Sequence, residues 1–423
     1  MQKTPLKFFS EVARDYGDVA GLSLLKFRTI FINHPDLIED VLVTNAKKYH
    51  KGRVLKANKR LFGEGLLTAE GDFWLRQRRL VQPAFHRARV AAYGETMVQF
   101  AESAMKQWRN GDERDIHAEM MEVTLQIVGK TLFNTDVAED AKEVGRTLDV
   151  LMRLGANFGR TILVPLWVPT PRNLRGRLGI RRIEKIIYRI IAERRASGFD
   201  GGDLLSMLLA AQDEDGTRMT DEQLRDETIT IFLAGHETTA NLLSWTWWLL
   251  AQNPQVEKKF HEELDGVLRG KSPTIEDLPK LEYTNHLLTE SLRLYPPAWG
   301  MARLAAEQHE IAGYPVRPGV GVAFVQWVVH RDPRWFDAPE EFRPERWGNG
   351  LARRIPRFAY FPFGGGPRQC VGNAFALMEA TLVLATIAQH FRFQLAPNHV
   401  VEPLASITLR PKTGIRVRMQ TRR

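Results

Sequence analysis

The chain has 423 residues, 44% of them hydrophobic and 26% charged, and its 59 basic and 50 acidic side chains leave a net charge of +9. This composition is typical of a globular enzyme, and the charge excess is too small for this length to indicate nucleic-acid binding. The single cysteine excludes a disulfide within the chain, and no apolar run is long enough to cross a membrane. The first residues also lack the apolar centre of a signal peptide. We therefore expect a cytoplasmic protein, and the sequence leaves open whether an anchor segment preceded Met1.

The fold class follows from where strand-like and helix-like segments fall. "VAGLSLL" (19–25) and "RTIFIN" (28–33) predict strands, a helix is predicted from about Pro35, and further strands are predicted within 309–327 and 407–420. Residues 70–251 predict mostly helices, interrupted by a proline-rich loop at 163–176. We expect a mainly α fold with a minor β portion. The prediction is a single domain, 1–423, whose small β-rich part comprises about 15–35 with 300–330 and 400–420.

A dense basic cluster follows the N-terminal part. The stretch "WLRQRRLVQPAFHRARV" (74–90) contains Arg76, Arg78, Arg79, Arg87 and Arg89. It is either a solvated helix face or a docking patch for an acidic partner or for buried carboxylates.

The longest predicted helix runs from about Asp221 to Gln252. Thr220 and Gln223 form a capping-box pattern at its start, and Asn253-Pro254 stops it. Its middle is apolar nearly all round, which predicts that it is buried along most of its length.

A polar group of residues, Ala234-Gly235-His236-Glu237-Thr238-Thr239, interrupts this apolar helix. Gly235 costs about 1 kcal/mol relative to alanine, and the threonines can bond back to carbonyls one turn earlier. The group is either a tolerated polar patch or a place where a ligand is admitted and protons are relayed to it. A zinc site of the HExxH kind fails, because the second histidine falls at Ala240.

Two further motifs are weak on their own. Glu290 and Arg293 share a face of a helix that ends before Pro296, but an exposed pair at this spacing contributes only about 0.2–0.5 kcal/mol. "GVLRGKS" (266–272) resembles a phosphate-binding loop and is one residue short between its glycines. A helix that ends at Gly270 explains it better.

The only cysteine, Cys370, lies in "FGGGPRQCVG" (363–372), directly before a predicted helix. A lone cysteine is either an inert core residue or a thiolate that acts as metal ligand or nucleophile. The helix N-terminus is expected to lower the thiol pKa, which favours the thiolate. Glycines on both sides let the backbone approach a flat, bulky group, so a planar cofactor fits better than a phosphate.

Together these segments resemble the cytochrome P450 monooxygenases. The cysteine loop fits the family's F-x-x-G-x-R-x-C-x-G pattern at every fixed position, and four other family segments occur in the family's order: Trp74-x-x-x-Arg78, Ala234–Thr239, Glu290-x-x-Arg293 and Phe342–Trp347. Trp347 stands where phenylalanine is usual, and we expect this difference to change packing only.

The resemblance implies a P450 fold built around haem b. Cys370 would be the axial thiolate, Phe363 would shield it, and backbone N–H groups near Gly366 and Gly372 would bond its sulfur. The propionates would meet Trp74, Arg78, Arg303 and Arg368, since buried carboxylates need charged donors. Ala234 would lie against the cofactor.

The resemblance also implies how oxygen and protons are handled. Gly235 would leave room for dioxygen, while Thr238 and Glu237 would supply protons from the distal side. Glu290, Arg293 and Arg346 would form a structural, non-catalytic ion-pair network. No role for His236 follows.

The substrate would be hydrophobic, for instance a fatty-acid-like or terpenoid molecule. The segments expected to contact it are 54–67, 154–169, 298–301 and 404–407, and the candidate residues are Leu66, Leu67, Ala298, Met301, Leu404 and Ile407. The stretch 63–86 looks closer to the fatty-acid hydroxylases of the family than to the camphor hydroxylases.

Electrons would come from NAD(P)H through a separate ferredoxin or flavoprotein that docks on the basic face near Cys370, because one cysteine cannot hold an iron–sulfur cluster. Two alternatives are a non-catalytic haem sensor and a haem-thiolate isomerase that rearranges peroxides. The retained Glu237 and Thr238 argue against both. The sequence does not reveal the substrate, the native redox partner or the oligomeric state.

Overall fold

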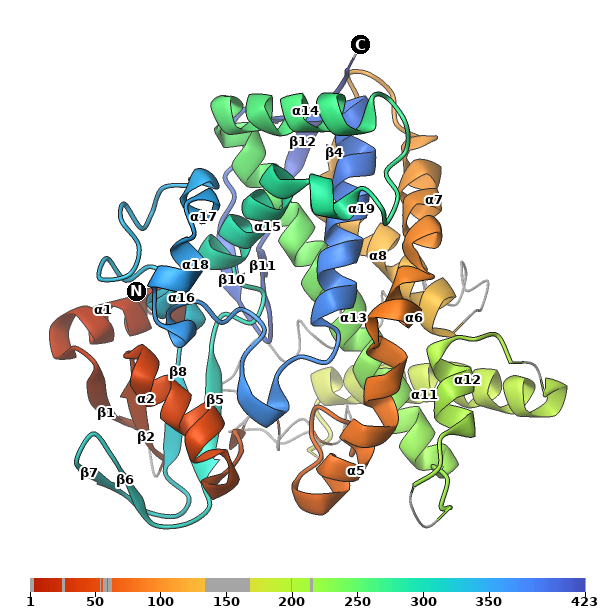
Figure 1. Ribbon diagram of the computed structural model, residues 1–423. Helices are drawn as coiled ribbons and strands as arrows, with labels where there is room; N and C mark the ends of the chain where they lie inside the picture. Colours follow the sequence, from red (N-terminus) through yellow and green to blue (C-terminus); the bar gives the residue numbers. More distant parts are fainter. Residues whose placement is uncertain are drawn as a thin grey trace.

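The structure, a computed structural model, describes residues 4–24, 27–53, 55, 59, 63–133, 168–198, 200–213 and 216–422 (Figure 1). Helices dominate these ranges, and short strands form four small sheets within them. This confirms the expected mainly helical fold with a minor β portion. None of the described helices is both long and apolar enough to cross a membrane.

The longer helices form the body of the molecule. In chain order they are α1 (Pro5–Tyr16), α5 (Gly71–Val81), α7 (Gly94–Met105), α8 (Ile116–Phe133), α11 (Pro171–Ser197), α13 (Asp221–Gln252), α14 (Pro254–Leu268), α15 (Glu282–Leu294) and α19 (Asn373–His390). Shorter ones are α2 (Pro35–Glu39), α6 (Arg87–Ala91), α12 (Leu204–Ala210), α16 (Gln326–Val329), α17 (Glu345–Gly348) and α18 (Leu351–Arg354).

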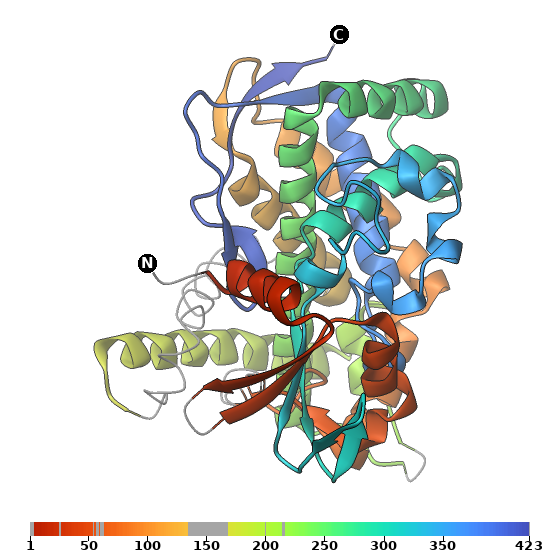
Figure 2. The same ribbon diagram turned by 90° about the vertical axis from the view of Figure 1, so that its left-hand side faces the viewer.

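Helix α13 is the axis of this body. It runs through the middle of the helical part in both views (Figures 1 and 2) and packs against α8, α11, α15 and α19. The predicted capping box is present, with the Thr220 hydroxyl accepting from the Gln223 N–H and the Gln223 side chain accepting from the Thr220 N–H. The predicted bounds are confirmed. Most of the helix is buried, as its all-round apolar pattern requires.

The largest sheet has the strand order β1-β2-β8-β5-β3. Its strands are β1 (Val19–Leu24), β2 (Phe27–Ile32), β8 (Gly321–Phe324), β5 (Met301–Ala305) and β3 (Tyr49–Lys51). Neighbouring strands are antiparallel except β2 and β8, whose parallel register pairs Ile30 with Val322. The sheet therefore joins the N-terminal strands to the region after α15, as the sequence predicted.

The C-terminal strands do not join that sheet. β10 (Pro403–Ala405) pairs with β11 (Leu409–Pro411), whereas β12 (Arg416–Thr421) lies between β4 (Glu113–Asp115) and β9 (Phe391–Leu395). A fourth sheet is the hairpin of β6 (His309–Ile311) and β7 (Tyr314–Val316). The C-terminal strands thus form sheets of their own, which strand pattern alone does not specify, and the grouping of 400–420 with 15–35 and 300–330 in one β-rich part stays a prediction.

The proline-rich interruption is shorter than predicted at its C-terminal end. Residues 134–167 lie outside the described part of the chain. Helix α11 begins at Pro171, with Thr170 as its N-cap, so 171–176 are helical rather than loop. Proline at the first helical position is favourable, because its missing N–H would have no partner there anyway.

Two hydrophobic cores frame the site. The larger collects side chains from α7, α8, α11, α13, α15 and α19, and the second lies between the large sheet and the segment from α2 to Leu42. The chain passes from one core to the other where the cysteine loop begins, because Phe361 belongs to the second core and Phe363 packs against the first.

Candidate functional site

The cysteine loop folds back on itself before α19. The Cys370 N–H donates to the Phe363 carbonyl at 3.0 Å, and the Gly364 N–H donates to the Phe361 carbonyl at 2.9 Å. Gly366 has a φ of +67°, and a Cβ atom there would lie 1.9 Å from the Leu42 carbonyl oxygen. Only glycine is tolerated in that position. The loop is thus held against the segment after α2.

The thiol of Cys370 is reached by solvent, yet protein atoms enclose it on most sides. This enclosure raises the pKa of the thiol, while the Gly372 N–H and the Arg78 charge act in the opposite direction. The expectation of a lowered pKa was wrong for the side chain by itself, because desolvation outweighs the helix terminus. The Gly372 contact agrees with the predicted bond from that backbone to the sulfur.

An opening lies beside the middle of α13. Ala234 is exposed and Thr238 is partly exposed, although Phe232, Leu233 and Glu237 next to them are buried. Accessible atoms in the middle of a mostly buried helix show that the surrounding side chains leave space beside Ala234 and Thr238, here called the hollow. The accessible thiol of Cys370 and the accessible residues of α13 fit a site for a large cofactor.

Glu237 is buried and held by the β10–β11 hairpin. The Thr408 hydroxyl donates to Glu237 Oε1 at 2.6 Å, and the Asn241 amide donates to Thr408 Oγ1 at 3.3 Å. Thr238 and Thr239 donate to the carbonyls of Ala234 and Gly235 at 2.7 and 3.2 Å, as the sequence predicted. Thr408 and Asn241 were missed, because a contact between residues 171 positions apart leaves no local signal.

Gly235 has a packing reason that the sequence did not reveal. A Cβ atom there would lie 3.1 Å from Val128 Cγ2 of α8, so glycine lets α8 approach α13 closely. His236 is buried, and its Nδ1 lies 2.9 Å from the Phe232 carbonyl oxygen. Burial lowers the pKa of His236 to about 4, so the ring is neutral near pH 7.

A second buried acid lies behind this group. Glu379 of α19 is fully buried, its two carboxyl oxygens have no hydrogen-bond partner among the described residues, and burial raises its pKa well above the usual range. Its helical surroundings gave no sign of this, since a single glutamate in an apolar helix is most simply interpreted as an outward-facing side chain.

Four charged residues from separate segments meet in what we call the open cluster: Lys51, Glu70, Arg303 and Arg368. Arg368 forms an ion pair with Glu70 and lies over the Trp74 ring, 5.1 Å from its centroid. Glu70 also accepts a hydrogen bond from the Lys51 N–H. The sequence predicted Trp74, Arg78, Arg303 and Arg368 as partners of one ligand; Lys51 and Glu70 were missed.

The open cluster carries three cations and one carboxylate. Among the described residues, Arg303 has no ion-pair partner and the buried Nη1 of Arg368 makes no hydrogen bond. Burial, together with the Arg368 charge, lowers the pKa of Lys51 to about 7 and that of Arg303 to about 10. Buried cations in excess are costly unless an anion joins them. The cluster therefore fits the paired carboxylates of a haem.

Arg78 is placed differently from these cations. Its Nη1 donates to the Gln369 carbonyl at 2.8 Å, and its Nε donates to Gln82. Arg78 thus supports the cysteine loop directly and places positive charge near the thiol.

The predicted ion-pair network is present, and we call it the closed network: Glu290, Arg293, Arg346 and Trp347. Arg293 and Arg346 donate to the Glu290 carboxylate at 2.8–2.9 Å. Their remaining N–H groups donate to backbone carbonyls of residues 330–341. All four side chains are buried.

Trp347 corrects an expectation. Its indole N–H donates to Glu290 Oε2 at 2.8 Å, so the tryptophan adds a hydrogen bond to the carboxylate as well as filling space. The expectation that tryptophan instead of phenylalanine at position 347 changes packing only was therefore wrong.

The predicted substrate contacts are only partly described. Leu66 and Leu67 pack against the larger core, and Met301 lies beside Gly364 of the cysteine loop. Leu404 and Ile407 are partly buried on the hairpin that carries Thr408, and Ala298 is exposed. Residues 154–167 and several of 54–62 lie outside the described part of the chain.

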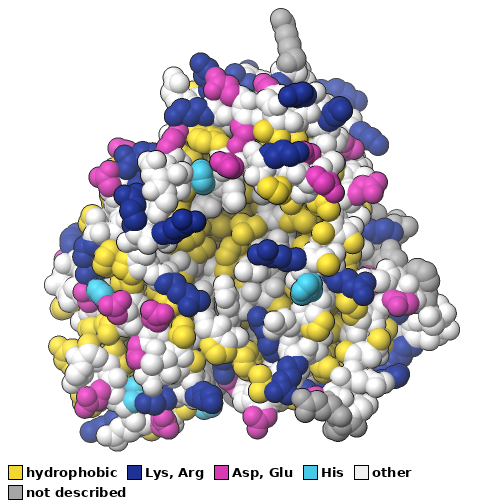
Figure 3. All heavy atoms as spheres, viewed as in Figure 1, with side chains coloured by type: hydrophobic (Ala, Val, Ile, Leu, Met, Phe, Trp, Pro, Cys, Tyr) yellow, Lys and Arg dark blue, Asp and Glu magenta, His cyan; other side chains and the backbone are white. Residues whose placement is uncertain are grey.

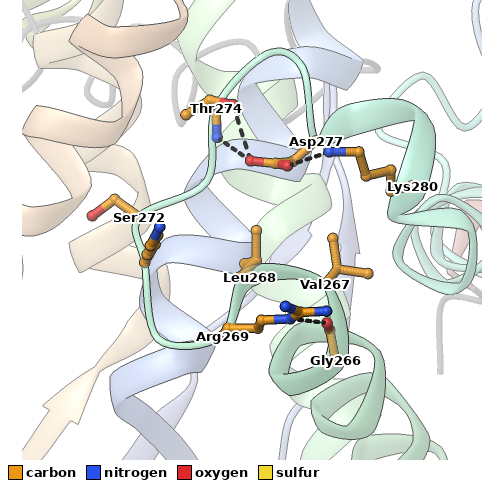
Figure 4. Close-up of a pocket in the computed structure, with 9 residues that line it drawn as sticks. Gly266, Val267, Leu268, Arg269, Ser272, Thr274, Asp277 and Lys280 are labelled. Atoms are coloured by element: carbon orange, nitrogen blue, oxygen red, sulfur yellow. Dashed lines mark hydrogen bonds and ion pairs between the residues drawn. The ribbon is translucent and has the colours of Figure 1, made fainter.

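A surface depression of about 560 Å³ follows α14 (Figure 4). Its polar groups largely bond one another: Asp277 accepts from Thr274 and Lys280, and Arg269 donates to the Gly266 carbonyl. Arg269 has a left-handed conformation and ends α14. This confirms a helix end rather than a phosphate-binding loop at "GVLRGKS".

One face of the molecule presents the cysteine loop together with basic side chains. Lys and Arg side chains surround the centre of this face, and Asp and Glu lie mainly toward its edge (Figure 3). A cavity of about 270 Å³ borders the loop, lined by Arg357, Phe363, Gln369 and Leu377 among others.

Comparisons with known proteins agree with this geometry. The family model described as Cytochrome P450 matches residues 1–418. Cyclooctat-9-en-7-ol 5-monooxygenase of Streptomyces melanosporofaciens is 37% identical over 94% of this chain and 86% of its own. Pentalenene oxygenase of Streptomyces avermitilis is 35% identical over 100% of this chain and 94% of its own. The crystal structure of the cytochrome P450DA heme domain superposes with a TM-score of 0.90 at 28% identity, covering 100% of this chain and 94% of that one.

Proposed function

Because the chain belongs to the cytochrome P450 family and is a haem-dependent monooxygenase, we propose that it oxygenates a terpenoid, with dioxygen as co-substrate and electrons originating from NAD(P)H. The names of two relatives, a cyclooctat-9-en-7-ol monooxygenase and a pentalenene oxygenase, support this substrate class. Bound haem supplies the iron centre at which dioxygen is reduced.

Two sets of side chains would hold the haem. Cys370 would ligate the iron through its sulfur, with the Gly372 N–H and the Arg78 charge stabilising the thiolate. Arg303, Arg368 and Trp74 would bind the propionates, which would complete the open cluster. Phe363 and Ala234 would contact the ring.

The observation that carries the monooxygenase assignment in this chain is that a buried acid, Glu237, directly precedes Thr238, which is accessible beside the hollow. Glu237 is a buried carboxyl group fixed by Thr408, so it can hold a proton at a defined position. The Thr238 hydroxyl donates to the Ala234 carbonyl, which leaves its oxygen lone pairs free to accept from a water molecule in the hollow. A protein that only binds haem does not need this pair.

The test is Thr238→Ala in the haem-loaded protein, reconstituted with a surrogate ferredoxin, its reductase and NADPH. We expect NADPH consumption to continue while less of it yields oxygenated product and more yields hydrogen peroxide. Thr246→Ala is a matched control, because Thr246 makes the same bond to the carbonyl one turn earlier but lies two turns further along the buried helix. Turnover of an organic peroxide without NADPH would instead support a peroxide-rearranging isomerase. Haem binding with no NADPH consumption would support a sensor.

The terpenoid proposal rests on the apolar character of the residues expected to contact the substrate as well as on the relatives. Leu66, Leu67, Met301 and Ile407 are aliphatic, and a terpenoid offers few polar groups for directional contacts. A screen of cyclic terpenes against fatty acids, read as Soret shifts of the ferric protein, tests the class. Shifts with fatty acids alone would contradict it.

We propose that a ferredoxin or flavoprotein delivers electrons at the basic face that carries the cysteine loop. Arg79 and Arg87 are exposed and belong to the predicted basic cluster at 74–90. Reversing either charge is expected to slow reduction at low salt without changing haem content, because long-range attraction steers the encounter. Equal reduction rates at low salt would contradict this docking site.

A further inference from the structure

The segment 63–69, here called loop 63–69, is fastened to α13 by carboxylates that the function described so far does not use. The Glu64 N–H donates to Asp226 Oδ2 at 2.6 Å, and the Leu66 N–H donates to Glu227 Oε2 at 3.0 Å. Asp226 and Glu227 lie about two turns before Gly235 on the same helix, which corresponds to roughly 12–14 Å at 1.5 Å per residue.

Lys51 holds the same loop from the opposite side. Its Nζ donates to the Leu66 carbonyl at 2.8 Å and to the Ala69 carbonyl at 2.7 Å. Leu66 is therefore bound through both groups of its backbone, its N–H by an acid of α13 and its carbonyl by a lysine of β3. These two hydrogen bonds fix the backbone of Leu66 and do not involve its side chain.

Steric contacts leave loop 63–69 little freedom to shift along α13. A Cβ atom at Gly65 would lie 2.3 Å from Thr230 Oγ1 and 2.6 Å from the Asp226 carbonyl oxygen, so only glycine permits this approach. Within the loop, the Thr68 hydroxyl donates to the Gly63 carbonyl at 2.6 Å. The loop is thus a preformed turn that is seated against the helix.

Two ionisable residues of this contact, Glu227 and Lys51, are more buried than such side chains usually are. Glu227 is fully buried and Lys51 is 5% exposed. Burial raises the pKa of Glu227 to about 7 and lowers that of Lys51 to about 7, and each charge partly offsets the cost of the other. Placing ionisable groups here is costly, and fixing the loop is a benefit that an apolar pair would not provide.

We propose that Asp226, Glu227 and Lys51 are positioning residues that clamp loop 63–69 to α13 and thereby set where Leu66 and Leu67 stand in the substrate pocket. This inference rests on the proposed function insofar as it takes these leucines to line that pocket. The clamp would make the loop a rigid wall, so the residues that hold it determine specificity without contacting the substrate.

Amide hydrogen exchange of the haem-loaded protein tests the clamp directly. Glu227→Leu removes the acceptor, and the Leu66 amide is expected to exchange about tenfold faster or more. Glu227→Gln keeps an oxygen acceptor and should restore protection close to that of the wild type. Glu222→Leu is the matched control, because Glu222 is exposed at the start of α13. Unchanged protection in Glu227→Leu would overturn the proposal.

Ligand binding tests whether the clamp sets the pocket. 4-Phenylimidazole binds haem whatever the natural substrate is. Its dissociation constant should change about tenfold in Glu227→Leu and stay close to the wild-type value in Glu227→Gln and Glu222→Leu. Wild-type affinity in Glu227→Leu would refute the specificity role. If the 4-phenylimidazole affinity changes in Glu227→Leu but the terpenoid screen is negative, the proposed substrate class is contradicted while the proposed clamp is supported.

A second variant addresses the same loop without touching a charge. Gly65→Ala introduces a methyl group against the Asp226 carbonyl and must displace the loop. It should speed exchange at Leu66 and alter 4-phenylimidazole binding as Glu227→Leu does. If Glu227→Leu does not take up haem, Gly65→Ala decides the question, and wild-type behaviour in this variant overturns the proposal.

Discussion

The closed network and the open cluster both gather basic side chains around a glutamate, but only the closed network is buried throughout and complete. In the open cluster Lys51 and Arg303 are buried, whereas Glu70 and Arg368 are partly exposed. In the closed network, the Glu290 carboxylate accepts from two arginines, the Trp347 indole and the Arg343 N–H, and the arginines use their other N–H groups on backbone carbonyls. In the open cluster, Glu70 is the one carboxylate among three cations, and the Nη1 of Arg368 has no partner among the described residues.

The difference separates a structural role from a ligand-binding role by physical criteria alone. A buried charge that the protein itself satisfies needs nothing more, whereas cations left in excess are stable only when an anion joins them. Burial, and after it the charge of Arg368, lowers the pKa values of Lys51 and Arg303, as expected for buried cations whose charge is not fully compensated. Four variants can break or sharpen this contrast.

The largest effect is expected from Glu290→Ala. It leaves the guanidinium groups of Arg293 and Arg346 buried without their carboxylate, which costs about 3–5 kcal/mol of unfolding free energy. Denaturant unfolding measures this, with or without haem. The control is Glu402→Ala, whose exposed pair with Lys412 should contribute less than about 1 kcal/mol. A loss as small as that of the control would show that the network is not structural.

Arg303→Met should behave in the opposite way. It removes a buried cation that has no ion-pair partner within the described residues, so the stability of the haem-free protein should change little or rise. Haem affinity should fall by roughly 10–100-fold, because a charge-assisted bond to a propionate is lost. Haem titration of the apoprotein measures the affinity. Lower apoprotein stability with unchanged haem affinity would make the open cluster a second structural network.

These contrasts also show which features could be read from the sequence. The bounds of α13, its capping box and the bonds of Thr238 and Thr239 were predictable, because they depend on residues within one or two turns. The resemblance brought Trp74, Arg303, Arg368 and Cys370 together across the chain. The single-domain organisation and the roles of the haem-contacting residues stay predictions.

What the sequence could not reveal depends on contacts between distant segments. Lys51 and Glu70 join Arg368 only when β3 and the start of α5 fold against the cysteine loop. The sign of the Cys370 pKa shift was wrong because local sequence shows the helix N-terminus but not the surrounding protein that desolvates the thiol. The hairpin partner of Glu237 was missed for the same reason.

Trp347→Phe sharpens the contrast within the closed network. It removes one donor to a buried carboxylate and keeps most of the ring, so unfolding free energy should fall by about 1.5–3 kcal/mol, less than for Glu290→Ala. The double variant Glu290→Ala/Trp347→Phe gives the coupling between the two side chains. If the two losses simply add, the hydrogen bond contributes nothing, and the original expectation of a packing difference is restored.

The smallest effect, taken per pH unit, is expected from the protonation of Lys51. Its pKa is about 7 in the folded protein and about 10.5 when exposed, so between these values the unfolded chain binds a proton that the folded chain does not. Stability of the haem-free protein should therefore rise with pH across this window, by at most about 1.4 kcal/mol per pH unit from this group. Lys51→Met removes the group and should flatten that part of the profile. In the haem-loaded protein the difference between Lys51→Met and wild type should shrink, because the propionates favour the charged lysine and bring its folded pKa closer to the unfolded value. An equal difference with and without haem would mean that no anion reaches the open cluster, and the contrast with the closed network would then have to rest on something other than a bound ligand.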